Sequence, residues 1–276
     1  MKGGFDEIGY WSELKLEIVQ KYAQAYSTIL SAVRDPSFWH VYIDGFAGAG
    51  FNVSRSTGEL VPGSPLNALR IVPPFREFFL VDLDGGKADR LRDVVGERRE
   101  VHILEGDCNT ILVRDVFPMV KYEEYRRGLC LLDPYGLDLN WEVIAAAGHM
   151  RSLELFLNFP VMDMNRNVLW SNPDSVDPEQ SRRMTAFWGD ESWRDFAYAT
   201  TGNLFGWAMR EPIDKVVNGF RERLKVVAGF DQVPEPIPMR NSKGAVVYYL
   251  FFASQKPVAG KIVKDTFQRY RNRGAV

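Results

Sequence analysis

The feature that most constrains the fold is a series of short apolar segments, each followed by an acidic residue. The acids at the ends of the first four segments are Asp44, Asp82, Asp107 and Asp133. The segments have the length and composition of buried strands, and a helical pattern separates most of them. Strands that alternate with helices favour a parallel, doubly wound α/β sheet. The carboxyl ends of parallel strands meet at one edge, so these four acids would line the crevice where such sheets bind ligands.

The first of these segments, residues 41–50 (VYIDGFAGAG), runs from a predicted strand directly into a turn of small residues. Asp44 ends the strand, and Phe46, Gly48 and Gly50 lie in the turn. Glycines at this place let a ligand approach bare backbone N–H groups. The turn does not fit the dinucleotide fingerprint G-x-G-x-x-G, because the third glycine is missing, and no Gly-Lys-Ser/Thr of a phosphate-binding loop follows.

Further along the chain, the pattern predicts four more parallel strands and a late antiparallel hairpin. The predicted strands cover residues 77–82, 101–104, 129–132 and 153–158, and the hairpin strands cover 237–240 and 245–253 around a turn at 241–244. The predicted helices cover 11–33, 65–71, 87–95, 141–147, 212–228 and 260–273. A final hairpin distinguishes the fold from dehydrogenase-type Rossmann folds. We expect a single domain over residues 1–276.

We divide this domain into an N-terminal helix (1–36), a cofactor-binding half (37–160), a helical insertion (161–210) and a C-terminal helix, hairpin and helix (211–276). The insertion carries four tryptophans, which could stack on nucleobases but at such density more often form a core: Trp170, Trp188, Trp193 and Trp207. The long connection at 51–63 suggests a short hairpin or flap that could act as a lid.

Composition limits the classes of function. The chain is 46% apolar and 25% charged, which argues against disorder, and its net charge of −2 gives no global attraction to nucleic acid or to a membrane. No apolar run approaches the roughly 18 residues that span a bilayer, and the N-terminus does not resemble a secretory signal. Two cysteines offer neither a disulfide framework nor zinc spacing, so we expect a cytoplasmic protein without a metal site.

Basic residues gather in the last predicted helix, where a solvated face is the simpler interpretation and a nucleic-acid surface the alternative. The basic residues are Lys261, Lys264, Arg269, Arg271 and Arg273. The aromatic residues Phe267 and Tyr270 lie between them, which favours the nucleic-acid alternative somewhat.

The spacing D-x-F-x-G-x-G from Asp44 to Gly50 is similar to motif I of S-adenosylmethionine (SAM)-dependent methyltransferases. The resemblance implies the class I methyltransferase sheet, with strand order 3-2-1-4-5-7-6 and the last strand antiparallel, and it implies SAM as the cofactor. It assigns the cofactor site to residues at the first three strand ends: Asp44, Phe46, Gly48, Gly50, Asp82, Asp84, Asp107 and Cys108. Among these, Asp82 resembles the acid that binds the ribose, and Glu105-Gly106-Asp107 resembles the motif beside the adenine.

The fourth strand end, Asp133-Pro134-Tyr135-Gly136, is similar to motif IV of amino-methyltransferases, with one departure. Their usual second proline is replaced by Tyr135, which makes the closer likeness the Asp-Pro-Phe-Gly of tRNA guanine-N2 methyltransferases. In this interpretation Asp133 and the Pro134 carbonyl hold the N–H groups of an exocyclic amine while Tyr135 stacks on the base. The alternatives are a plain strand-end turn and a core position for Tyr135.

A polar run follows the fifth strand, where substrates often border the crevice. The candidate substrate-binding residues here are Asn158, Asp163, Asn165 and Arg166. The last three could equally cap the first helix of the insertion.

Across almost its whole length the sequence resembles one narrower family, the three-Cys-motif partner proteins (TcmP). The shared words lie at residues 42–50, at GSPL (63–66), GDCN (106–109), LDPYGL (132–137) and NFPVMDMNRN (158–167). The resemblance implies a methyltransferase-like protein associated with a three-cysteine-motif protein that resembles radical SAM enzymes. From the four strand-end acids and the Asp-Pro-Tyr-Gly motif at residues 133–136, we expect a SAM-dependent methyltransferase acting on an exocyclic amine of a nucleobase in nucleic acid. The alternative is a methyltransferase-like partner of the three-cysteine protein with little or no catalysis of its own.

Overall fold

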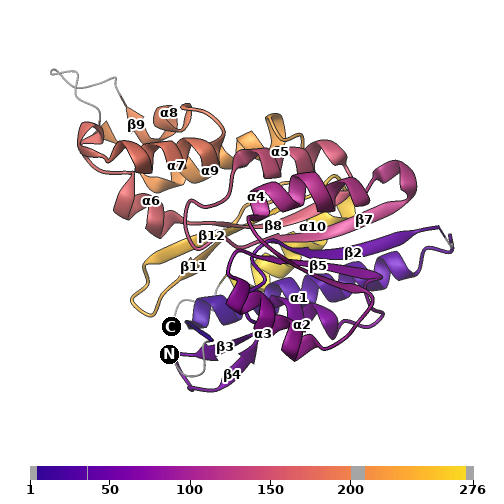
Figure 1. The fold of residues 1–276 in the computed structure, drawn as a ribbon. Helices are drawn as coiled ribbons and strands as arrows, with labels where there is room; N and C mark the ends of the chain where they lie inside the picture. The colour runs from indigo at the N-terminus through magenta and orange to yellow at the C-terminus, as the bar shows by residue number, and fades with distance from the viewer. Residues whose placement is uncertain (1–4, 36, 200–208, 272–276) are drawn as a thin grey trace.

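A computed structural model describes residues 5–35, 37–199 and 209–271. Its centre is a seven-stranded sheet in the spatial order β6-β5-β2-β7-β8-β12-β11 (Figure 1). The seven strands are β2 (Trp39–Asp44), β5 (Glu77–Asp82), β6 (Val101–Glu105), β7 (Arg126–Leu132), β8 (Leu153–Phe159), β11 (Ile237–Arg240) and β12 (Val246–Ala253). The expected mixed α/β architecture with a large sheet is therefore confirmed.

The five strands from β6 to β8 pair in parallel, whereas β12 runs antiparallel to β8 and β11 antiparallel to β12. Counted in chain order within this sheet, the sequence of strands is 3-2-1-4-5-7-6. The β11–β12 hairpin turns at residues 241–245, and Tyr249 pairs with Phe159 at the carboxyl end of β8. The turn of the hairpin therefore projects from the same edge of the sheet as the carboxyl ends of the parallel strands.

Helices cover both faces of the sheet and bury a separate apolar core on each (Figure 1). One face packs against α1 (Tyr10–Ser31), α2 (Ser64–Leu69) and α10 (Pro257–Tyr270). The other packs against α4 (Cys108–Ile111), α5 (Trp141–Met150) and α9 (Ile213–Val226). Helix α3 (Gly85–Val95) connects β5 to β6. Between α4 and β7 the chain forms a π-helical turn at Leu112–Val116 and 3₁₀ turns at Phe117–Met119 and Tyr122–Glu124.

Helix α1 forms because apolar residues recur at helical spacing along one face, with Ile18 and Tyr22 almost fully buried. It begins after Gly9, which is the N-cap residue. Lys15 lies within the buried stripe of this helix and is only 6% exposed.

The insertion after β8 is mainly helical, as expected, in the described residues 161–199 and 209–210. It contains α6 (Val161–Asn167), a 3₁₀ turn (Pro173–Ser175), α7 (Pro178–Trp188), α8 (Trp193–Ala197) and a short ladder of β9 (Tyr198–Ala199) with β10 (Met209–Arg210). Trp188 and Trp193 are core residues, whereas Trp170 is 41% exposed. Trp207 lies outside the described residues.

The connection at 51–63 forms a hairpin of β3 (Phe51–Ser54) and β4 (Leu60–Pro62), as the sequence suggested. A third strand, β1 (Asp6–Ile8), pairs in parallel with β3 and extends the hairpin to a three-stranded sheet. The sequence did not predict this strand. The N-terminal segment is thereby fixed beside the ligand edge of the main sheet. No helix in the described part of the chain is long and apolar enough to cross a membrane.

Candidate functional site

The carboxyl ends of β2 and β5 are joined by hydrogen bonds through Asp82. Its Oδ2 atom accepts the Gly48 N–H at 2.7 Å, and its Oδ1 atom accepts the Asp84 N–H at 2.9 Å. The Asp82 carbonyl also accepts the Gly106 N–H from the end of β6, at 2.9 Å. The Asp82 carboxylate thus ties the glycine turn to the end of β5, and the Asp82 carbonyl ties the end of β5 to the turn after β6.

Gly48 has the backbone conformation that the glycine turn requires. Its φ of +67° is in the left-handed region, and the space that a Cβ would occupy is open. Gly50 also has a positive φ, and its carbonyl accepts the Gly63 N–H at 2.7 Å, which ties the turn to the β3–β4 hairpin. Phe46 packs partly against the core, and its N–H donates to Asp44 Oδ1 at 3.2 Å.

Asp44 is fully buried beneath this turn. Burial raises the pKa of its carboxyl to about 7, although hydrogen bonds from Ser64 and the Phe46 N–H favour the charged form, and Asp133 adds to the increase. A buried carboxyl with such a pKa is poised to ionise when a cation arrives. Asp44 therefore suits a positively charged ligand held above it.

Three of the expected cofactor residues have local structural roles. Asp84 caps α3, with Oδ1 accepting the Gly86 and Lys87 N–H groups, and Asp107 caps α4 by accepting the Asn109 N–H at 3.0 Å. Cys108 is 5% exposed and packs into the core, and burial raises the pKa of its thiol to about 12. Its side chain therefore contributes to the core and not to the surface of the crevice.

Asp133, at the end of β7, forms an ion pair with Lys15 of α1. The Lys15 side chain is 7% exposed and that of Asp133 is 25% exposed, so the pair closes the site from the α1 side. Sequence reasoning missed Lys15. The available signal was a lysine inside an apolar helical stripe, which in a folded protein needs a buried acid.

Pro134 and Asn158 connect the ends of β7 and β8. The Asn158 Nδ2 group donates to the Pro134 carbonyl at 3.0 Å, and Asn158 is 7% exposed. Its Oδ1 atom is buried without a hydrogen-bond partner among the described residues. Asn158 therefore fixes the orientation of the Pro134 peptide and leaves an additional acceptor beside it.

Tyr135 extends from this loop toward the N-terminal strand. Its hydroxyl donates to Asp6 Oδ2 at 2.7 Å, the Lys87 ammonium contacts the same oxygen at 2.6 Å, and Lys87 lies 5.3 Å from the Tyr135 ring centroid. Burial would raise the pKa of Asp6, but the hydrogen bonds from Lys87 and Tyr135 outweigh it and lower that pKa. Tyr135 is 77% exposed, so the alternative of a core position for this residue does not hold.

Asp163 holds the same loop from α6. Its Oδ2 atom accepts the Leu137 N–H at 3.0 Å and lies 3.7 Å from Arg183, while Oδ1 accepts from Asn167 at 2.6 Å. A Cβ at Gly136 would come within 2.7 Å of Asp163 Oδ2, which explains the glycine at the end of the motif. Both oxygens of Asp163 accept hydrogen bonds, so this side chain positions the end of the motif.

The two other expected substrate residues lie on α6 with exposed or half-buried side chains. Asn165 Oδ1 accepts from Arg210 at 2.6 Å, and Arg166 is exposed. A further apolar side chain lies at the crevice: Leu83, between Asp82 and Asp84, is 76% exposed. An exposed leucine between two strand-end acids could pack against the face of a flat ring of a ligand. Sequence reasoning missed Leu83, and the available signal was an apolar residue directly after the end of a strand.

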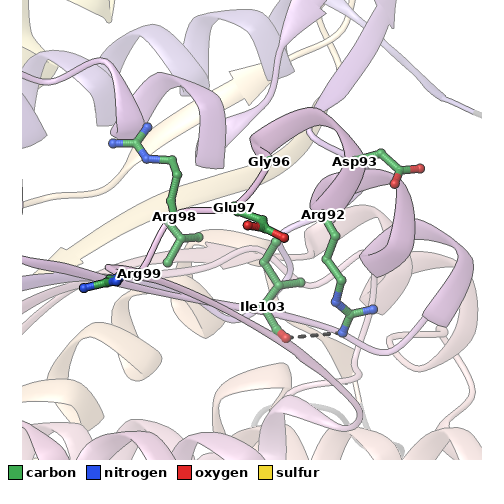
Figure 2. A pocket seen from close by; sticks show the side chains of 8 residues that line it. Arg92, Asp93, Gly96, Glu97, Arg98, Arg99 and Ile103 are labelled. Atoms are coloured by element: carbon green, nitrogen blue, oxygen red, sulfur yellow. Dashed lines mark hydrogen bonds between the residues drawn. The ribbon is translucent and has the colours of Figure 1, made fainter.

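A separate groove of about 860 Å³ lies between the C-terminal half of α3 and the edge strand β6 (Figure 2). It is lined by Arg92, Asp93, Gly96, Glu97, Arg98, Arg99, Val101 and Ile103. The Arg92 guanidinium donates to the Ile103 carbonyl at 3.3 Å, which covers part of the free strand edge. Because the strand-end acids lie at the opposite end of α3, this groove is not part of the candidate site.

Comparison with solved structures supports the fold. A crystal structure of protein LPL1258 from Legionella pneumophila, described with the family model DUF519, matches with a TM-score of 0.53 and 14% identity, covering 99% of this chain and 95% of that chain. At this identity the similarity concerns the fold alone. A DszA carbon methyltransferase matches with a TM-score of 0.43 and 13% identity, covering 88% of this chain and 54% of that chain. No protein-family model and no curated protein matches the sequence.

Proposed function

We propose that this protein is a SAM-dependent methyltransferase of class I type that acts on an exocyclic amine of a nucleobase in nucleic acid. The observation that carries the proposal is the convergence of Asp44, Asp82 and Asp133 at one edge of the sheet, around a glycine turn. The strand order 3-2-1-4-5-7-6, with its antiparallel strand, agrees with the architecture expected of such enzymes.

The residues at this edge fit SAM by their chemistry. The space at Gly48 is open, Asp44 is a buried carboxyl suited to a cationic group, and Leu83 offers an exposed apolar face. Asp82 would hold the ribose hydroxyls while keeping the Gly48 N–H, because a carboxylate has about four acceptor sites. When bound, SAM supplies an electrophilic methyl group.

The chain's own residues would bind and orient the amine. Asp133 and the Pro134 carbonyl are acceptors for its two N–H groups, and Asn158 fixes that carbonyl through the bond at 3.0 Å. An amine held by two acceptors keeps its lone pair directed toward the crevice, which is catalysis by positioning. Lys15 balances the charge of Asp133, so the carboxylate stays available as an acceptor. Tyr135 lies at the rim beside the base.

Calorimetric titration with S-adenosylhomocysteine (SAH) tests the cofactor part of the proposal. We expect saturable binding that Asp82→Ala weakens and Asp133→Ala leaves nearly unchanged. Methyl transfer from labelled SAM to mixed single-stranded RNA and DNA tests the reaction, which Asp133→Ala should abolish. A well-folded protein that binds no SAH would refute the assignment.

A second candidate is a methyltransferase-like partner of a three-cysteine-motif protein, with little catalysis of its own. Two observations favour it: Asp133 already has a cationic partner in Lys15, and Tyr135 replaces the usual proline. Co-purification with a three-cysteine-motif protein, together with the methyl-transfer assay, distinguishes the partner protein from the methyltransferase. Binding that Asp133→Ala leaves intact, from a protein without methyl transfer, would favour this candidate.

A further inference from the structure

The edge of the sheet that holds the candidate site also carries a group of exposed cations. Arg166 lies on α6, and Arg210 on β10 donates to Asn165 of the same helix at 2.6 Å. Arg240 and Lys243 lie at the β11–β12 turn, and both are exposed. We call these four residues, together with Trp170, the basic rim.

Strand pairing places the two parts of the basic rim on the same edge. Helix α6 begins one residue after β8 ends at Phe159, and the β11–β12 turn projects past that strand end because Tyr249 pairs with Phe159. Helix α6 also packs against β12. In Figure 1 both α6 and the β11–β12 turn lie toward the left of the molecule. Asp163, near the start of α6, accepts the Leu137 N–H of the loop at residues 133–137, the proposed catalytic loop, so the rim is attached to the candidate site.

The cations of the rim differ from most other arginines of the chain in lacking carboxylate partners. Arg92, Arg151 and Arg223 each form an ion pair with an aspartate. Within the described residues, Arg210 instead binds an asparagine and Arg240 the Gly244 carbonyl at 2.9 Å, while Arg166 and Lys243 form no side-chain hydrogen bond or ion pair.

Three acids that lie close to Arg166 or Arg210 in the sequence have other partners. Asp163 binds the catalytic loop, Glu211 pairs with Lys215 at 2.7 Å, and Asp214 accepts from Tyr249 at 3.0 Å. In the described part of the chain, none of the four rim cations forms an ion pair with a carboxylate. The chain as a whole carries a net charge of −2.

Trp170 adds an aromatic surface to these charges. It is 41% exposed, whereas Trp188 and Trp193 are buried. Its Nε1 group donates to the Arg166 carbonyl at 2.7 Å, which fixes the indole one helical turn from the Arg166 side chain. An ordered, exposed indole beside unpaired guanidinium groups is the combination that binds single-stranded nucleic acid by stacking and by phosphate contact.

We propose that the basic rim binds a single strand of nucleic acid next to the target base, with Trp170 stacked on a flanking base and the four cations on the phosphodiester backbone. This rests on the proposed function, and it places the nucleic-acid surface on the insertion and hairpin instead of on the C-terminal helix.

The test is fluorescence anisotropy with a labelled 12-nucleotide RNA of mixed sequence and the matching DNA, each single-stranded and duplex, at several salt concentrations. We expect tighter binding of the single strands. Arg166→Ala/Lys243→Ala should weaken binding and reduce the salt slope by roughly 1.4, about 0.7 per lost phosphate contact. Trp170→Ala should weaken binding about tenfold or more. Comparison of the RNA titration with the DNA titration shows which of the two nucleic acids the protein prefers.

The matched control is Lys261→Ala/Lys264→Ala, which removes two exposed cations from α10. Loss of binding in this control but not in the rim variants would overturn the proposal, as would wild-type protein that binds no oligonucleotide. Titration of the same samples with SAH separates the proposal for the basic rim from the proposal that the protein binds SAM. If SAH binds and the rim variants bind nucleic acid normally, the rim proposal fails while the cofactor assignment stands.

Discussion

The ammonium group of Lys15 and the carboxylate of Asp133 form an ion pair between helix α1 and the end of strand β7, although 118 positions separate them in the sequence. The pair fixes the α1-facing side of the loop at residues 133–137. Because the Lys15 side chain is 7% exposed, neither water nor another residue readily replaces it.

Replacing Lys15 by methionine should destabilise the protein by about 1–3 kcal/mol, since it leaves a partly buried carboxylate unpaired. Asp133→Asn added to this variant should recover part of the loss. The measurement is urea unfolding of both single variants and the double variant. Lys21→Ala on the same helix is the control, because its pair with Glu17 is exposed and worth little. Equal, small effects of the two lysine substitutions would contradict a structural role for the pair.

Binding of SAH should depend on the ionisation of Asp44. Burial raises the pKa of this carboxyl to about 7, so it is protonated in the free protein at lower pH and must lose its proton when the ligand's ammonium group binds. Affinity should therefore fall as pH decreases below about 7, by up to about tenfold per pH unit. Calorimetry between pH 5.5 and 8.5 measures this. Asp44→Asn should flatten the pH profile, and a flat wild-type profile would refute the linkage.

Glu154, at the start of β8, should make stability depend on pH. Burial raises its pKa to about 7 from 4.5, although Tyr22 and Ser254 donate to it. The folded state favours the neutral acid, so this contribution to stability is fully present below about pH 4.5 and is lost as pH rises through about 7. Glu154→Gln should therefore stabilise the protein at pH 8.5 by on the order of 1–3 kcal/mol and have little effect at pH 5. Urea unfolding at both pH values would show a gain confined to high pH. A gain of equal size at pH 5 would mean that ionisation is not the cause.

The contact of Tyr135 and Lys87 with Asp6 should slow the exchange of a ligand in the crevice, because it attaches the N-terminal strand to both sides of the site. Tyr135→Phe and Asp6→Asn should each speed SAH dissociation several-fold in stopped-flow measurements. Glu7→Gln is the control, since this neighbour on the same strand is exposed and lies 3.9 Å from Arg55. Unchanged dissociation rates in both test variants would show that the contact does not restrain the ligand.

Local sequence determined much of the fold and the composition of the crevice. The alternation of apolar segments with helical stripes predicted the large α/β sheet, because periodicity depends only on neighbours along the chain. The turn around Gly48 could be predicted for the same reason, since a positive φ is a local requirement that glycine meets. The end of each strand then placed Asp44, Asp82 and Asp133 at one edge.

Only the tertiary structure decided which groups these acids contact. Lys15, Asp6 and Asp163 contact the loop at residues 133–137 from other elements of the fold, and no local pattern specifies such pairs. Asp84 and Cys108 are predicted cofactor residues, and the packing gives the Asp84 side chain a helix to cap and the Cys108 side chain a place in the core. The residue type determines which groups a side chain can bind. The group that it contacts depends on the packing of distant elements, because desolvation and distance determine which contacts form.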